Sequence, residues 1–292
     1  MCPNNKYFFI TTNGNSASRW LAQTLNMHPD IICSHSPARI SISMSYDHAY
    51  SDNEFRKIMG DEYRKRIPVD MMLDELEQTG EALCYGNVHM FNLRQLRENT
   101  SQNKTKKCFR VVDLVRHPVP FVQSGTSNML RQAQFNSDRL KYLESVYFRN
   151  RELYDDFASI YELDFNDLNV LSFMANVMTL KSLSINMQIQ DVDHRITMES
   201  ITKDKMVYRN LVDIISEGEV SADDQWLSDV FSTNAINRHK VGKRFSEPKE
   251  IYNGWANWQK DFFDLLVEIS RIDRHYSTAF EYDFSFLQKY NR

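Results

Sequence analysis

Short apolar runs alternate with amphipathic stretches in the first half of the chain, and this alternation constrains the fold more than any other feature. Residues 7–12, 31–34, 82–86 and 109–115 have the composition of short strands, and residues 18–27 and those from Pro118 onward have helical spacing. Strands that alternate with helices form a parallel sheet covered by helices. With a further strand candidate at 195–198, the sequence predicts an α/β fold with a central parallel sheet of about five strands flanked by helices.

The second half of the chain is expected to be mostly helical. Four stretches are predicted to form helices: residues 138–160, 165–188, 203–215 and 258–272. Residues 216–250 look rich in loops and carry a basic cluster. No internal repeat or low-complexity linker marks a boundary, so we expect a single domain over residues 1–292.

Composition and charge argue against several classes of function. The formal net charge of −4 disfavours a general nucleic-acid binder. The four cysteines lack C-x-x-C spacing and indicate neither a zinc site nor a disulfide framework: Cys2, Cys33, Cys84 and Cys108. No run of about 18 apolar residues is present, and the strand at 7–12 leaves no room for a signal peptide. We therefore expect a cytoplasmic protein with reduced thiols, no membrane span and no nucleic-acid partner.

The run that follows the first strand, residues 12–20 (TNGNSASRW), suits a phosphate. Small side chains let backbone N–H groups approach an anion, while the start of a helix and serine hydroxyls add further donors. An ordinary serine-capped helix would show a similar pattern. The run lacks the second glycine and the lysine of G-x-x-x-x-G-K-[ST], and Gly14 stands alone, unlike the glycines of G-x-G-x-x-G. Both absences disfavour ATP and NAD as ligands.

A second candidate anchor follows the strand at 109–115. Arg116 stands at the carboxyl end of this strand, and Pro118 suits the first turn of a helix. Ser124 then lies eight residues after Arg116, and a guanidinium and a hydroxyl so placed can hold one phosphate. Taken alone, Arg116 would be expected to pair with a surface carboxylate.

Together, the two segments resemble the cofactor motifs of sulfotransferases that use 3′-phosphoadenosine 5′-phosphosulfate (PAPS). Residues 16–19 (SASR), before Leu21, resemble the 5′-phosphosulfate loop [KR]-[SG]-G-T-[TR]-x-L. Residues 27–31 (MHPDI) resemble the H-P-D-[IV] segment of tyrosylprotein, glycosaminoglycan and many bacterial sulfotransferases. The strand followed by Arg116-His117-Pro118 and by Ser124 resembles the 3′-phosphate motif. The basic residue at the head of the family's loop falls here on Asn15.

This resemblance implies a P-loop type sulfotransferase that binds PAPS and releases adenosine 3′,5′-bisphosphate. It assigns cofactor binding to two groups of residues: Gly14, Asn15, Ser16, Ala17, Ser18, Arg19 and Trp20, then Arg116 and Ser124. Trp20 could stack near the adenine or be a core aromatic. In the family a late basic loop closes over the 3′-phosphate, and residues 237–244 (NRHKVGKR) resemble it through Arg238, Lys240 and Gly242. His28 and His117 are expected to cap or orient their motifs.

Sulfuryl transfer requires a base for the acceptor's proton, and the resemblance implies two candidates. His35 falls on or beside the position of a glutamate in the tyrosylprotein and glycosaminoglycan enzymes, and His89 lies roughly where cytosolic sulfotransferases carry the histidine of K-T-H. Each could instead be a structural histidine, and both could line one pocket. Three basic residues are candidates to offset the charge of the departing 5′-phosphate: Arg19, Arg39 and Lys243. In-line transfer requires no metal.

The H-P-D context favours a carbohydrate or small-molecule acceptor, with a hydroxyl or an amine as the accepting group. Residues 36–80 are expected to form a lid or an acceptor wall. Asn15 keeps a second interpretation open, a homologue that binds PAPS or the bisphosphate with little or no catalysis. A P-loop nucleotide kinase is a third, disfavoured by the missing G-K-[ST].

Overall fold

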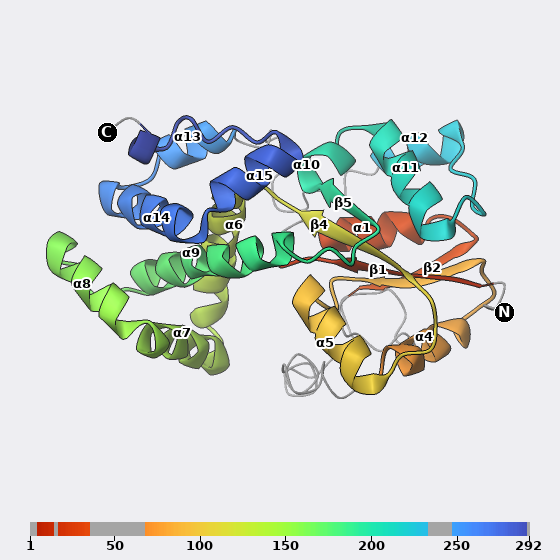
Figure 1. Ribbon diagram of the computed structural model, residues 1–292, viewed down its shortest axis with the longest axis horizontal. Coiled ribbons are helices and arrows are strands. Elements are labelled where there is room, and N and C mark those ends of the chain that lie inside the picture. The colour runs from red at the N-terminus through yellow and green to blue at the C-terminus, as the bar shows by residue number, and fades with distance from the viewer. Residues whose placement is uncertain (1–4, 15–16, 36–67, 233–246, 291–292) are drawn as a thin grey trace. The chain divides into compact units, whose positions relative to one another are not determined.

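The computed structural model describes residues 5–14, 17–35, 68–232 and 247–290 (Figure 1). The chain divides into two compact units, each assembled from two separate stretches of sequence. Unit 1 comprises residues 1–115 and 189–243, and unit 2 comprises residues 116–188 and 244–292. The single domain expected from the sequence stays a prediction.

Unit 1 is built on a parallel sheet of five strands. The strands are β1 (Lys6–Thr11), β2 (Ile31–His35), β3 (Cys84–Val88), β4 (Arg110–Val115) and β5 (His194–Thr197). They lie in the order β2-β3-β1-β4-β5, and every neighbouring pair is parallel. Ile10 pairs with Val88 on one side and with Val112 on the other, so β1, β3 and β4 end at the same edge. The predicted α/β fold with a parallel sheet of about five strands is confirmed.

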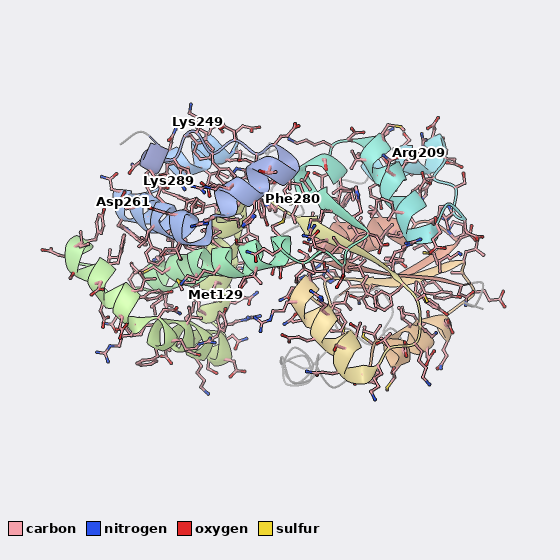
Figure 2. All side chains as sticks on the ribbon, viewed as in Figure 1. Met129, Arg209, Lys249, Asp261, Phe280 and Lys289 are labelled. Carbon is pink, nitrogen blue, oxygen red and sulfur yellow. The ribbon has the colours of Figure 1, made fainter. Side chains whose placement is uncertain are left out.

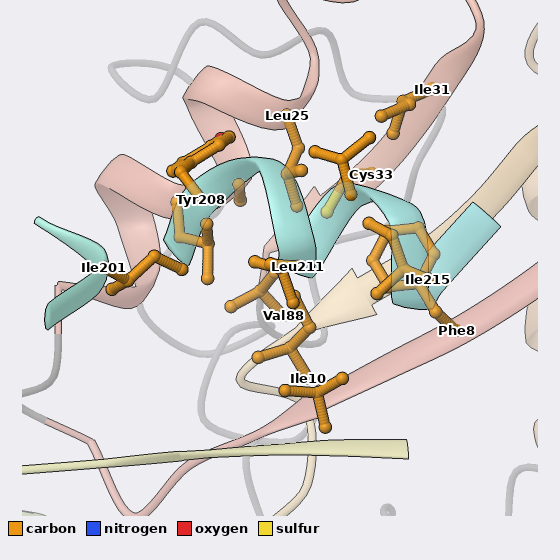
Figure 3. Close-up of a cluster of buried hydrophobic side chains, with 14 of the residues drawn as sticks. Phe8, Ile10, Leu25, Ile31, Cys33, Val88, Ile201, Tyr208, Leu211 and Ile215 are labelled. Carbon is orange, nitrogen blue, oxygen red and sulfur yellow. The ribbon is translucent and has the colours of Figure 1, made fainter. Parts of the chain in front are cut away.

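Side chains alternate between the two faces of the sheet, as the period of a strand requires. Phe8 and Ile10 of β1 pack with α1 (Ser18–Leu25), α11 (Lys205–Ser216) and α12 (Asp224–Ser232) in the cluster that Figure 3 shows. Tyr7 and Phe9 face the opposite way, toward α4 (Val69–Glu77) and α5 (Leu93–Asn103). The helices therefore cover both faces of the sheet (Figure 1).

Local sequence explains where the helices of unit 1 begin. Asn92 and Gln95 form a capping box at the start of α5, in which Asn92 Oδ1 accepts from the N–H of Gln95 and Gln95 Oε1 accepts from the N–H of Asn92. Asp204 caps α11 by accepting from the N–H of Met206 at 2.8 Å. The short helix α10 (Met198–Ile201) follows β5 directly and is capped by Thr197.

The described part of unit 2 is helical. Its elements are α6 (Pro118–Ala133), α7 (Ser137–Arg149), α8 (Arg151–Tyr161), α9 (Leu168–Met187), α13 (Pro248–Asn253), α14 (Asn257–Ser270), α15 (Ile272–Phe280) and the 3-10 helix η2 (Gln288–Tyr290). Helix α9 lies at the centre and contacts α6, α7, α14 and α15. Side chains fill the space between these helices (Figure 2).

Helix α9 is also long and apolar enough, by length and composition, to cross a membrane. Of its 18-residue window, 61% is buried inside the protein. A helix in the core of a packed bundle can have the same length and composition, and the burial of α9 is that of such a central helix.

Three segments differ from the sequence-based expectations. The helix predicted at 138–160 is two helices, α7 and α8, which meet at Asn150 with φ −125° and ψ 23°. The stretch 216–250 contains α12, which buries Leu227 and Val230, so it is not loop throughout. Of the proposed lid, 36–67 lie outside the described residues, whereas Leu73 and Leu76 of α4 are buried against the sheet. This last part is core, because its apolar side chains cover β1 and β3.

Candidate functional site

The loop between β1 and α1 lies at the carboxyl edge of the sheet. The N–H of Gly14, which has φ 89°, donates to Thr12 Oγ1 at 3.2 Å. The residue before α1 is Ala17, in the left-handed region with φ 56°, and its side chain makes no capping hydrogen bond. The N-cap of α1 is therefore not a serine. A helix start without a side-chain cap presents backbone donors that suit an anion.

His35 and His89 lie together beside this loop. His35 ends β2, and His89 follows β3, the neighbouring strand, in which Val88 pairs with His35. The two rings stack with centroids 5.4 Å apart and planes inclined by 22°. His35 Nε2 lies 3.1 Å from the hydroxyl oxygen of Ser18, the first residue of α1. Two histidines that the sequence offered as alternatives thus form one cluster with a serine of the phosphate loop.

The backbone of His89 is strained, with φ 76°. Its N–H donates to the carbonyl oxygen of Ile10 at 3.0 Å, which ties the turn after β3 to β1. A Cβ added to Gly14 would lie 3.5 Å from His89 Cε1, so this ring also flanks the loop. A non-glycine residue with positive φ costs free energy and persists where its surroundings hold it, often at functional sites.

Asn87 holds the turn that carries His89, and sequence reasoning missed it. Its side chain is buried at 1% exposure, donates to Ser34 Oγ at 2.7 Å and accepts from the N–H of Met90 at 2.8 Å. It thereby links the ends of β2 and β3. An asparagine inside an apolar strand was the signal that could have revealed this role.

The environment of His35 keeps its imidazole neutral. Burial lowers the pKa of His35, and together with the neighbouring His89 and Arg19 it brings the pKa to about 3. A neutral imidazole can accept a proton from an acceptor group, and it is a more effective base when a bound anion brings its pKa closer to the working pH.

The second predicted anchor lies in unit 2, at the start of α6. Arg116 Nη1 donates to Ser124 Oγ at 2.9 Å, so the two residues of the 3′-phosphate motif lie in contact. His117, which follows Arg116, caps α6, since its Nδ1 accepts from the N–H of Val119 at 3.2 Å. Its ring is buried, and burial lowers the pKa of His117 to about 4. In unit 1, His28 Nδ1 accepts from the N–H of Asp30 at 3.2 Å, so both histidines orient their segments as expected.

Trp20 does not stack on an adenine, which corrects one assignment. Its side chain is 2% exposed and packs edge-to-face against Tyr208 at 5.7 Å and against Phe231 at 6.2 Å. Two residues beyond Ser18, the helix has turned by more than half a revolution, so Trp20 points into the core. It is the core aromatic of the two alternatives.

Several predicted site residues lie outside the described residues: Asn15, Ser16, Arg39, Arg238, Lys240, Gly242 and Lys243. Arg19 is described and lies exposed on the first turn of α1. Across the described ranges, no group of three or more histidine, cysteine, aspartate or glutamate residues is arranged to hold a metal ion.

A buried carboxylate on β4 lies close to the same edge and contacts residues of the two neighbouring strands. Sequence reasoning missed it as well. Asp113 of β4 is 1% exposed, accepts from Thr11 Oγ1 at 2.8 Å and has Arg195 Nε at 3.9 Å. Burial raises the pKa of Asp113 to about 6, against the opposing effects of Thr11 and Arg195. An aspartate within an otherwise apolar strand was the available signal.

No family model matches this chain, and no curated protein does. Among solved structures, the crystal structure of a sulfotransferase from Alicyclobacillus acidocaldarius aligns over 100% of both chains with a TM-score of 0.47 and 14% identity. A match at this level is too weak to assign an activity.

Proposed function

We propose that this chain moves a sulfuryl group from PAPS to a hydroxyl or amine of a carbohydrate or small-molecule acceptor. The observation that carries the proposal is the cluster of Ser18, His35 and His89 at the carboxyl ends of β1, β2 and β3. Ligands of parallel α/β sheets bind beyond the carboxyl ends of the strands. A hydroxyl at a helix start suits an anion, and a neutral imidazole suits a general base.

The donor sets suit the two charged ends of PAPS. For the 5′-phosphosulfate we propose the loop from Gly14 to Arg19, whose backbone donors and Ser18 hydroxyl can bind anionic oxygens. For the 3′-phosphate we propose Arg116 and Ser124, a guanidinium and a hydroxyl already 2.9 Å apart. Arg238, Lys240 and Gly242 are proposed as further 3′-phosphate contacts on their motif alone.

In the proposed reaction the acceptor oxygen attacks sulfur in line with the leaving group. The acceptor's proton moves to an imidazole of the His35–His89 pair as the new S–O bond forms. The bond between sulfur and the bridging oxygen breaks, its electron pair stays on the 5′-phosphate, and adenosine 3′,5′-bisphosphate is released. Donors of the loop stabilise the negative charge that develops on that phosphate.

Calorimetric binding of adenosine 3′,5′-bisphosphate tests the cofactor assignment. We expect Arg116→Ala to raise the Kd by roughly 10- to 100-fold, because a hydrogen bond to a charged group contributes about 1.5–3 kcal/mol. Arg131→Ala is the matched control, since Arg131 is exposed on the same helix and donates to Asn128 of that helix at 3.0 Å. Absence of bisphosphate binding in the wild-type protein would overturn the proposal.

A turnover assay with PAPS and a panel of sugars, phenols and amines tests catalysis. We expect release of the bisphosphate that depends on an acceptor and that His35→Gln abolishes. Tight binding of the bisphosphate with no transfer to any acceptor would instead favour a homologue that binds PAPS without catalysis. Magnesium-dependent binding of ATP would favour a nucleotide kinase.

A further inference from the structure

The Ser18 hydroxyl contacts the proposed base and belongs to the proposed phosphate loop. Its oxygen lies 3.1 Å from His35 Nε2, and the Ser18 side chain is largely buried at the first position of α1. A serine hydroxyl has one hydrogen to donate and two lone pairs that accept. Ser18 can therefore donate to His35 or to an anion, but not to both at once.

An anionic oxygen accepts hydrogen bonds and has none to donate. When Ser18 donates to such an oxygen, its contact with His35 remains a hydrogen bond only if His35 Nε2 carries a hydrogen. In a neutral imidazole the lone pair then resides on Nδ1. Anion binding at the start of α1 thus selects one tautomer of His35, in which Nδ1 is the basic atom.

Building on the proposed function, we propose that Ser18 and His35 form a relay that couples proton removal from the acceptor to departure of the 5′-phosphate. The acceptor oxygen bonds to sulfur while its proton moves to His35 Nδ1. The bond from sulfur to the bridging oxygen breaks, and its electron pair stays on the 5′-phosphate. His35 becomes an imidazolium that donates through Nε2 to Ser18 Oγ, and Ser18 donates to the phosphate oxygen that has gained charge.

This relay supplies positive charge to the 5′-phosphate, and the sequence has an uncharged residue, Asn15, at the head of the loop. The positive charge forms when His35 takes the acceptor's proton. The Ser18 hydroxyl then lies between this imidazolium and the phosphate. The groups that face His35 oppose the imidazolium, because burial, His89 and Arg19 all lower the pKa of its imidazole. A bound phosphate acts in the opposite sense, since a nearby negative charge favours the imidazolium.

His89 is a positioning residue in this scheme. Its ring stacks on His35 with centroids 5.4 Å apart and also flanks Gly14. Because two imidazolium charges at this distance repel each other, the pair carries at most one positive charge during the reaction. The stacked ring of His89 also fixes the orientation in which His35 Nε2 meets Ser18.

Nitrogen NMR of the histidine-labelled protein tests the relay directly. The signals of His35 are assigned by their loss in His35→Gln. We expect adenosine 3′,5′-bisphosphate to move the hydrogen of His35 onto Nε2 in the wild-type protein. The same titration of Ser18→Ala should leave the tautomer of His35 unchanged, and Ser232→Ala, at an exposed serine of α12, should respond as the wild type does.

Turnover at saturating PAPS gives the second readout. We expect Ser18→Ala to lower kcat on the order of 10²-fold, as loss of one transition-state donor does, and Ser18→Thr to restore most of the lost rate. A hydrogen of His35 on Nδ1 in the bisphosphate complex of the wild type, or full turnover by Ser18→Ala, would overturn the relay while the proposed function stands. No bisphosphate binding in the wild type would overturn both. The wild-type NMR titration decides even where Ser18→Ala fails to fold.

Discussion

Gly86 sets how closely β3 can approach the side chain of its neighbour on β1. It pairs with Phe8, which is 0% exposed, and a Cβ built on Gly86 would lie 2.5 Å from three ring atoms of Phe8. The ring thus occupies the space that any larger residue would need. This contact lies on β3, the strand that contains Asn87 and leads to His89. It therefore also fixes the position of the strand that supports the candidate site.

We expect Gly86→Ala to destabilise the protein by about 1–3 kcal/mol, because the buried ring of Phe8 must move to admit a methyl group. The free energy of unfolding in urea measures this change. Gly254→Ala is the control, since the closest atom to its added Cβ is a backbone oxygen at 3.5 Å, an ordinary contact. Equal stability of the two variants would contradict this account of Gly86.

Individual side chains also show which features of the candidate site could not be predicted from the sequence. His35 and His89 were two candidate bases that could line one pocket, but chain order does not reveal that β2 and β3 are neighbours in the sheet. Ser18 and Trp20 were grouped as cofactor contacts because both follow the loop, yet the turn of α1 separates them, one toward His35 and one into the core. Adjacency in sequence cannot reveal the direction of each side chain, which depends on the assembled fold.

Helix α6 is held at its start by a buried histidine. His117 Nδ1 accepts from the N–H of Val119, Nε2 lies 3.4 Å from the carbonyl oxygen of Asp283, and the ring stacks on Phe284. Both nitrogens are satisfied only in the neutral form, with hydrogen on Nε2 donating to Asp283. Protonation would place a second hydrogen against the N–H of Val119. The C-terminal segment and the start of α6 therefore depend on a neutral His117.

We expect this histidine to make the protein acid-sensitive. Its folded-state pKa of about 4 results from burial first, with Arg116 lowering it and Asp283 raising it. Because an unfolded histidine has a pKa near 6.5, the unfolded chain binds more protons between these values. The stability that depends on neutral His117 is complete above pH 6.5 and is lost as the pH falls toward 4. The free energy of unfolding should decrease by about 2 kcal/mol between pH 7 and pH 5.

Urea unfolding of His117→Asn at pH 7 and pH 5 measures this contribution. Asparagine keeps an N-cap acceptor but does not titrate, so the variant should lose less stability than the wild type when the pH is lowered. His194→Asn, at an exposed histidine of β5, should keep the wild-type pH dependence. An unchanged pH dependence in His117→Asn would contradict the assignment.

At the scale of the whole chain, hydrophobic patterning predicted most strands and helices, but not how they are grouped. The parallel sheet follows from alternating strands and helices, and its five members lie close to their predicted ranges. The division into two units does not follow from local pattern, because each unit combines segments far apart in sequence. The break at Asn150 was missed for a related reason, since apolar spacing continues across it from α7 into α8.

A network of buried polar side chains near the C-terminus links several helices of unit 2. Lys289 Nζ lies 2.7 Å from Asp273, its N–H donates to Asp264 at 2.9 Å, and Tyr252 donates to Asp264 at 2.9 Å. Asp264 and Asp273 are 6% and 4% exposed. Buried carboxylates of this kind require their partners, because a lone buried charge is strongly destabilising.

We expect Lys289→Met to destabilise unit 2 by roughly 3 kcal/mol, since it leaves the carboxylate of Asp273 without its ammonium partner. Hydrogen exchange followed by mass spectrometry should show lost protection in α14 and α15 but not in the strands of unit 1. Lys249→Met, at an exposed lysine of α13 that Figure 2 labels beside Lys289, is the control. Equal loss in both units would contradict this and would support one cooperative domain.

The interleaving of the two units has a consequence for synthesis on the ribosome. Strand β4 ends at Val115, and its partner β5 begins only at His194, after the whole of residues 116–188 has been made. At about 5–20 residues per second, several seconds pass in which the edge of β4 has no strand to pair with. An open strand edge attracts other chains. The nascent protein should therefore need a chaperone most during translation of α6 to α9, and a translational pause there should increase its aggregation.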